Sequence, residues 1–202
     1  DVVIVGAGPA GLSTACKLAQ LCQDHEVSLD ICLIEKGSEI GAHILSGAVL
    51  ETSALDELFP DWQNMGTPVK TEVTDEEVLL LLNGNSALNV PDFLVPTALD
   101  NTGNYVISLG NLCRWLGVQA ENLGVQIFTG FTAADILYDD SGAVIGIVTG
   151  DMGRDQAGFE KDNFEAGYEL QAKYTVFAEG CRGHLGKQLI EKFGLDKGKA
   201  PQ

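Results

Sequence analysis

The most constraining feature of this sequence is its opening, where an apolar run, a glycine turn, a helical pattern and a second apolar run follow in order. Val2 to Val5 are four β-branched residues, typical of a strand buried on both faces. Gly6 to Gly11 then form G-x-G-x-x-G directly before an apolar stripe at helical spacing. Leu29 to Ile34 are the second run, and Glu35 ends it. This order predicts a dinucleotide-binding βαβ unit.

Each residue of the turn has a physical reason to be there. Gly6 allows the chain to turn sharply off the strand, Gly8 leaves room for a pyrophosphate, and Gly11 lets the helix lie close to the sheet. Pro9 has no N–H group, and it stands at the helix start, where such a group would have no partner within the helix. The remaining N–H donors there and the helix dipole attract an anion. Glu35 is placed to accept hydrogen bonds from ribose hydroxyls, and it would repel a 2′-phosphate, which argues against NADP.

Charge and hydropathy exclude several other classes of protein. The formal net charge is −17, so nucleic acid is an unfavourable partner, and so is an anionic lipid surface apart from a local apolar plateau. No apolar run approaches the ~18–20 residues of a membrane span. The chain begins at Asp1 without a methionine, inside the first predicted strand, so we expect a trimmed sequence rather than a signal peptide.

The five cysteines favour reduced thiols over a metal site. Their number is odd, and no C-x-x-C is present. Cys16, Cys32 and Cys113 occupy apolar positions of predicted helices or strands, so we expect buried free thiols. Neither a zinc site nor an iron–sulfur site is predicted.

The pattern changes after the first unit. Segment 37–48 is either an ordinary connector or a stretch that passes under a flat cofactor ring. Ser53 is predicted to cap a short helix over 54–59. Strands are predicted at 69–73, 78–82 and 87–90, with a hairpin turn at Asn83-Gly84. We therefore expect residues 1–66 and 105–202 to form a cofactor domain, incomplete at its C-terminal end, with 67–104 inserted as a β-rich segment.

The second half of the chain supports the same architecture. We expect a strand at 105–109, a helix from 112 to 123, a strand at 125–128 and a hairpin of 131–138 with 143–148. Residues 152–167 are predicted to be a loop, 170–177 a strand and 185–193 a helix. The predicted fold is α/β, a Rossmann-like FAD/NAD(P)-binding fold of the glutathione-reductase type with an inserted β-rich subdomain.

Several specific motifs can be matched to a family. The runs GAGPAGLS, IGAHILSGA, LFPDW, GNYVISLG and FAEGCRGHL occur in this order and span nearly the whole chain. In these motifs the sequence resembles the N-terminal FAD portion of the electron transfer flavoprotein–ubiquinone oxidoreductase family. Thr102 departs from it, because the family commonly has His there.

The resemblance implies a set of FAD contacts. The pyrophosphate would lie on the first glycine turn, the adenosine ribose beside Glu35 and Lys36, and the flavin ring beside segment 41–47. A second contact turn is implied at 178–180, with Arg182 either a neighbour of that turn or part of a salt bridge. The implied cofactor-binding residues are Gly6, Ala7, Gly8, Pro9, Ala10, Gly11, Glu35, Lys36, Gly41, Ser46, Gly47, Ala178, Glu179 and Gly180. No catalytic side chain and no metal ligand is implied.

The resemblance also implies an activity and partners. Family members pass electrons from reduced electron transfer flavoprotein to membrane ubiquinone, and they are peripheral on the bacterial cytoplasmic or mitochondrial inner membrane. Their iron–sulfur cluster lies in a C-terminal part that this sequence lacks, so we expect an N-terminal fragment with segment 67–104 on the quinone side. Two alternatives stay open: a flavin reductase or monooxygenase of the geranylgeranyl-reductase type, and an FAD-binding module without turnover.

Overall fold

The computed structural model describes residues 1–155 and 158–199, and it divides into two compact units. The first unit contains Asp1–Ile44 and Cys113–Gln202, and the second contains Leu45–Leu112. The domain boundaries expected at 66/67 and 104/105 stay a prediction.

The first unit is built on a parallel four-stranded sheet with the order β14-β1-β2-β8. Its strands are β1 (Val2–Val5), β2 (Ile31–Glu35), β8 (Gln126–Thr129) and β14 (Tyr174–Phe177). All four residues of β1 are buried, as expected for the strand with neighbours on both sides and layers on both faces. The parallel sheet and the opening βαβ unit are therefore confirmed.

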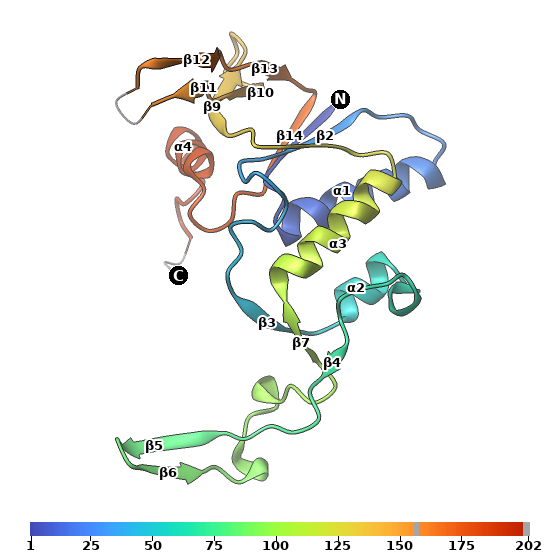
Figure 1. Ribbon diagram of the computed structural model, residues 1–202, viewed down its shortest axis with the longest axis vertical. Coiled ribbons are helices and arrows are strands. Elements are labelled where there is room, and N and C mark those ends of the chain that lie inside the picture. The colour runs from blue at the N-terminus through green and yellow to red at the C-terminus, as the bar shows by residue number, and fades with distance from the viewer. Residues whose placement is uncertain (156–157, 200–202) are drawn as a thin grey trace. The chain divides into compact units, whose positions relative to one another are not determined.

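Helices accompany this sheet as Figure 1 shows: α1 (Pro9–Asp24), α3 (Leu109–Asn122) and α4 (His184–Phe193). The buried face of α1 consists of Gly11, Leu12, Ala15, Cys16 and Ala19, which is the stripe expected from the sequence. The thiol of Cys16 lies 3.7 Å from the carbonyl oxygen of Leu116, so α1 and α3 pack side by side (Figure 1). Gly124, with φ +94°, follows α3 as its predicted stop.

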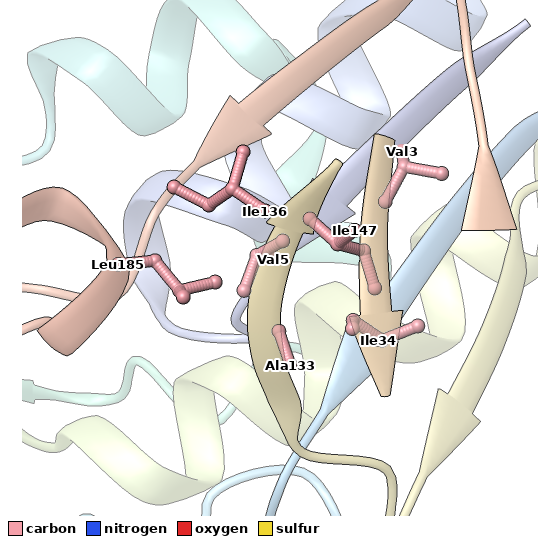
Figure 2. Packing of buried hydrophobic residues seen from close by; sticks show 7 residues of the cluster. All are labelled: Val3, Val5, Ile34, Ala133, Ile136, Ile147 and Leu185. Atoms are coloured by element: carbon pink, nitrogen blue, oxygen red, sulfur yellow. The ribbon is translucent and has the colours of Figure 1, made fainter. Parts of the chain in front are cut away.

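An antiparallel layer covers one face of the parallel sheet. It consists of β9 (Ala133–Tyr138), β10 (Val144–Thr149) and β13 (Glu169–Gln171) in the order β13-β10-β9. Figure 2 shows its side chains meeting those of β1, β2 and α4 in one apolar cluster: Val3, Val5, Ile34, Ala133, Ile136, Ile147 and Leu185. Because side chains alternate along a strand, Val3 and Val5 share this face, and Ile4 is left to the opposite one.

The second unit is mostly β-structure. Its small antiparallel sheet has the order β3-β7-β4, from β3 (Gly47–Leu50), β7 (Tyr105–Ser108) and β4 (Thr71–Glu72). A separate hairpin pairs β5 (Leu79–Asn83) with β6 (Ser86–Asn89), close to the predicted strands and turn (Figure 1). The short helices are α2 (Ser53–Leu58), η1 (Trp62–Asn64), η2 (Asp92–Leu94) and η3 (Thr97–Leu99).

Four local predictions were wrong. Residues 152–167 are not all loop: β11 (Met152–Arg154) pairs with β12 (Glu160–Glu165), and the Arg154 side chain ties this hairpin together through Asp151, Glu160 and the Phe164 ring. Such a polar hairpin lacks the apolar alternation that identifies strands in a sequence. The strand over 69–73 shrinks to β4, whose two residues are both exposed.

The predicted strand over 170–177 is two strands in different sheets. β13 pairs with β10, whereas β14 pairs with β1. The chain changes sheet at Lys173, whose N–H donates to the carbonyl oxygen of Asp1. Ser53 is also not a cap, because it is already the first residue of α2 and Thr52 precedes it without a capping side-chain hydrogen bond.

Candidate functional site

Three turns of the first unit follow the carboxyl ends of neighbouring parallel strands. In the sheet register Val5 stands beside both Ile34 and Phe177, so the residues after these positions emerge at one edge. The Gly6 N–H donates to the carbonyl oxygen of Ile34 and the Ala178 N–H to that of Val5, each at 2.8 Å. This edge is where open α/β sheets bind ligands.

The turn after β14 lies directly against the glycine loop. Gly6 has φ +103°, and a Cβ atom there would lie 2.6 Å from the carbonyl oxygen of Ala178. A Cβ atom at Gly11 would overlap the carbonyl oxygen of Gly6 and lie 3.3 Å from the Ala178 Cβ. Two segments more than 160 residues apart in the sequence therefore form one tightly packed cradle, with no room for side chains at Gly6 and Gly11.

Gly8 faces open space. It is the N-cap of α1 with extended backbone (φ −79°, ψ −179°), and a Cβ atom there would meet nothing within 4 Å. No side chain caps this helix, Pro9 stands at its start, and its first turn contains no acidic residue. The N–H groups of the first turn and the positive end of the helix dipole are thus available to an anion. The residues present fit the pyrophosphate of a dinucleotide.

Glu35 fastens the second strand to the glycine loop. Its Oε2 accepts a hydrogen bond from the Ala7 N–H at 2.9 Å, and its Oε1 accepts one from the Gly37 N–H at 2.7 Å. A carboxylate has about four lone-pair sites, so both oxygens can accept further bonds from hydroxyls. Lys36, the neighbouring predicted contact, is exposed.

The carboxylate of Glu179 points to α4. Its side chain is only 13% exposed, and its Oε2 accepts a hydrogen bond from the Gly186 N–H at 2.9 Å. Its Oε1 lies 3.4 Å from the Nδ1 of His184. Gly180, the next residue, is exposed and has φ +77°. The 178–180 turn thus joins the glycine loop through Ala178 and α4 through Glu179.

The predicted ring-side residues fall in both units. Gly41, in the first unit, is buried with φ +79°. Ser46 and Gly47 belong to the second unit and are exposed, and Gly47 starts β3, where a Cβ atom would lie 2.9 Å from the carbonyl oxygen of Ile107. Contact of these residues with a flavin ring stays a prediction. Arg182 is exposed.

The cysteines are all free thiols. Cys16 and Cys113 are buried, as expected, and Cys32 is half-buried. Burial raises the pKa of Cys16 to about 12 and that of Cys113 to about 11, and it also raises the pKa of Cys32. Such thiols are poor nucleophiles at neutral pH.

Three glycines of this site were not singled out from the sequence. Gly37 donates to Glu35, Gly186 donates to Glu179, and Gly183 is the N-cap of α4, where a Cβ atom would lie 2.5 Å from that of Glu179. The spacing of Glu179, Gly183 and Gly186 around the start of a predicted helix was the available signal.

The comparisons with known proteins agree with this geometry. A family described as the NAD(P)-binding Rossmann-like domain matches residues 4–59. The electron transfer flavoprotein-ubiquinone oxidoreductase of Pseudomonas aeruginosa is 58% identical over 97% of this chain, and the mitochondrial protein of that name from Sus scrofa is 50% identical over 100% of it. The chain matches the N-terminal portion of electron transfer flavoprotein–ubiquinone oxidoreductases. It covers 36% and 32% of the length of these two relatives, about a third.

The solved structures extend the likeness of fold. A geranylgeranyl bacteriochlorophyll reductase-like protein from Thermoplasma acidophilum has a TM-score of 0.61 at 19% identity, covering 93% of this chain and 41% of that one. At this identity the likeness concerns the fold alone. The predicted Rossmann-like flavoprotein fold and the resemblance to electron transfer flavoprotein–ubiquinone oxidoreductases are both confirmed.

Proposed function

We propose that this chain is the FAD-binding N-terminal portion of an oxidoreductase that passes electrons from reduced electron transfer flavoprotein to membrane ubiquinone. The observation that carries the proposal is the cradle in which Ala178 packs on Gly6 and Gly11 beside the uncapped start of α1. The 58% identity to a relative of that name supports the choice of activity.

Different residues of the cradle would contact different parts of FAD. The backbone from Gly6 to Gly11 would receive the pyrophosphate, because it offers N–H donors, a helix start and open space at Gly8. Glu35 would accept hydrogen bonds from the adenosine ribose while keeping its own bonds to Ala7 and Gly37. The Ala178–Gly180 turn would close the other side of the site.

FAD, when bound, supplies chemistry that accepts electrons singly and delivers them in pairs. The chain's own contribution is to bind and orient this group. No side chain is proposed as a general acid, base or nucleophile, and the buried thiols of Cys16 and Cys113 stay protonated at neutral pH. The iron–sulfur cluster is proposed for the part of the protein beyond this chain.

The second unit offers a surface for the quinone side. Large apolar side chains on and after the β5–β6 hairpin are at least half exposed, and we name them the leucine hairpin surface: Leu79, Leu80, Leu81, Leu82, Leu88, Phe93, Leu94 and Leu99. Because neighbouring residues of a strand point to opposite faces, this hairpin exposes leucines on both of its faces, and extensive apolar exposure of this kind marks a contact site. Because ubiquinone is dissolved in the membrane, we propose that this surface touches the bilayer, with the protein peripheral on the inner membrane. No helix among the described residues is long and apolar enough to span one.

A reductase or monooxygenase of the geranylgeranyl-reductase type is the second candidate. The reductase-like protein from Thermoplasma acidophilum shares the fold, and at 19% identity this likeness concerns the fold only. The much higher identity to the ubiquinone oxidoreductases favours the first proposal. A chain that holds FAD without turnover is compatible with the same cradle.

The test is flavin retention by the purified chain. After excess FAD is added and unbound FAD removed, we expect a perturbed flavin absorbance spectrum. Gly8→Glu should abolish it, because the new carboxylate would occupy the open space and repel the pyrophosphate. Gly84→Glu, in the turn of the β5–β6 hairpin, is the control and should retain flavin. A folded wild-type chain without flavin contradicts the proposal.

A further inference from the structure

We propose that Glu179 is a positioning residue: its carboxylate takes the place of the N-cap side chain that α4 lacks, and thereby holds the 178–180 turn against the glycine loop. The proposal rests on the FAD-binding function above. It assigns Glu179 a contribution to cofactor binding that acts through the backbone of the turn rather than through contact with the cofactor.

The start of α4 has no capping side chain of its own. Its N-cap is Gly183, and its first turn contains no acidic residue. The Gly186 N–H, the third of the helix, instead donates to Oε2 of Glu179 at 2.9 Å, and this acceptor belongs to a residue seven positions earlier. A capping acceptor normally stands at the N-cap itself, so Glu179 fills that place from outside the helix.

Gly183 keeps the space in which the Glu179 carboxylate lies. A Cβ atom at Gly183 would lie 2.5 Å from Glu179 Cβ and 2.7 Å from its Oε2. The backbone of Gly183 has φ −54°, which any residue can adopt, so only the neighbouring side chain excludes a larger residue. At Gly186 a Cβ atom would lie 3.8 Å from Glu179 Oε2, an ordinary contact.

The capped helix is tied to the cradle from both sides. Leu185, the second residue of α4, is fully buried in the apolar cluster with Val5 and Ile34 (Figure 2). On the other side, Gly183 N–H donates to the carbonyl oxygen of Gly180 at 3.2 Å, and Ala178 lies against Gly6 and Gly11. Releasing Glu179 from α4 therefore removes one of the contacts that hold the turn whose carbonyl group packs on the glycine loop.

Four variants test the capping role without any cofactor. In the apo chain, Glu179→Ala should speed hydrogen exchange at the Gly186 amide by roughly 3- to 30-fold, as expected for loss of a cap. Glu179→Gln should largely preserve protection, because its amide oxygen can still accept from Gly186. Gly183→Ala should lower thermal stability, and Gly186→Ala, the matched control, should not.

A double variant separates collision from helix propensity. Alanine is a poorer N-cap than glycine, and that cost is independent of Glu179. If Gly183→Ala acts by striking the carboxylate, it should cost clearly less in the Glu179→Ala background than in the wild type. An equal cost in both backgrounds would overturn the proposed packing, and unchanged Gly186 exchange in Glu179→Ala would overturn the cap.

Flavin retention tests the link to the cradle. We expect FAD affinity to fall about tenfold in Glu179→Ala and to stay within about threefold of wild type in Glu179→Gln, with an unaltered flavin spectrum in both bound forms. Normal affinity in Glu179→Ala despite faster Gly186 exchange would overturn the positioning role. An altered flavin spectrum in Glu179→Gln would show direct contact instead. If the wild type binds no FAD, the proposed function fails, while the exchange data still decide the cap.

Discussion

The carbonyl oxygen of Ala178 lies where a side chain on Gly6 would have to go, 2.6 Å from the position of a Cβ atom. This contact joins the turn after β1 to the turn after β14. It explains the glycine at position 6 twice over, since φ there is +103° and the neighbouring space is filled. The cradle is thus formed by the turn after β14 as much as by the glycine loop after β1.

Gly6→Ala should therefore unfold more easily and lose FAD. We expect the free energy of unfolding to fall by about 2–4 kcal/mol, from backbone strain together with the collision. Gly130→Ala is the matched control, because φ there is +81° but a Cβ atom would meet nothing within 4 Å. It should cost about 1 kcal/mol. Urea denaturation followed by circular dichroism measures both, and equal losses would contradict the contact.

Replacing Glu35 should weaken the fold as well as the ribose site. Both carboxylate oxygens accept backbone N–H bonds, so Glu35→Gln must turn its amide NH₂ toward one of two donors. We expect a loss of about 1–3 kcal/mol of stability. Glu39→Gln is the comparison, because its ion pair with Arg114 is largely exposed and should be worth less than about 1 kcal/mol. Similar losses in the two variants would show that Glu35 does not fasten the loop.

Because the thiols of Cys16 and Cys113 are buried, we expect the free energy of unfolding to fall at high pH. The pKa of Cys16 is raised to about 12 and that of Cys113 to about 11, from 9.0. Above pH 9 the unfolded chain releases these protons while the folded chain keeps them, so stability falls as pH rises toward 11. Each thiol should cost about 1 kcal/mol between pH 8.5 and 10. The variant Cys16→Ala/Cys113→Ala should show a shallower decline in urea denaturation across this range, and an unchanged slope would count against thiol burial as its cause.

The leucine hairpin surface should bind lipid without help from charge. We expect the chain to co-sediment with neutral phosphatidylcholine vesicles and less with anionic ones, because its net charge is −17. Leu80→Ser/Leu81→Ser/Leu82→Ser should reduce binding at least tenfold, since each buried leucine contributes about 1.5–3 kcal/mol. Phe159→Ser, which removes an apolar residue exposed on another hairpin, should bind like the wild type. Equal lipid binding by the two variants would show that this surface does not make the lipid contact.

The sequence was sufficient for those parts of the fold that carry a period or a turn signature. The β1–α1–β2 unit, the β9–β10 hairpin and α4 all follow from apolar spacing bounded by glycine or by the Asp-Asp-Ser-Gly turn. The β11–β12 hairpin did not follow, because its stability comes from polar contacts of Arg154 rather than from an apolar face. The break between β13 and β14 depends on the distant carbonyl group of Asp1, which no local pattern reveals.

The candidate site, too, was predicted from the sequence only in part. The open space at Gly8 and the position of Glu35 are properties of a local motif, and the sequence predicted both. The attachment of Glu179 to α4 was missed, because an acidic residue followed by glycine after a strand indicates only a turn. Side chains from elements far apart in the sequence decide whether such an acid faces a ligand or a helix.

The most direct test of the account is a ¹H–¹⁵N NMR titration of the chain with FAD. We expect the amide signals of Ala7, Gly8, Gly11, Gly180 and Ala178 to shift together, because these residues surround the cradle. ADP carries the pyrophosphate-bearing half of FAD and can be titrated alone. With ADP, the amide signals of Asn85 and Ala87, in and beside the turn of the β5–β6 hairpin, should not shift. Shifts with ADP at the glycine loop and the 178–180 turn would support the account. Shifts confined to the second unit would contradict it.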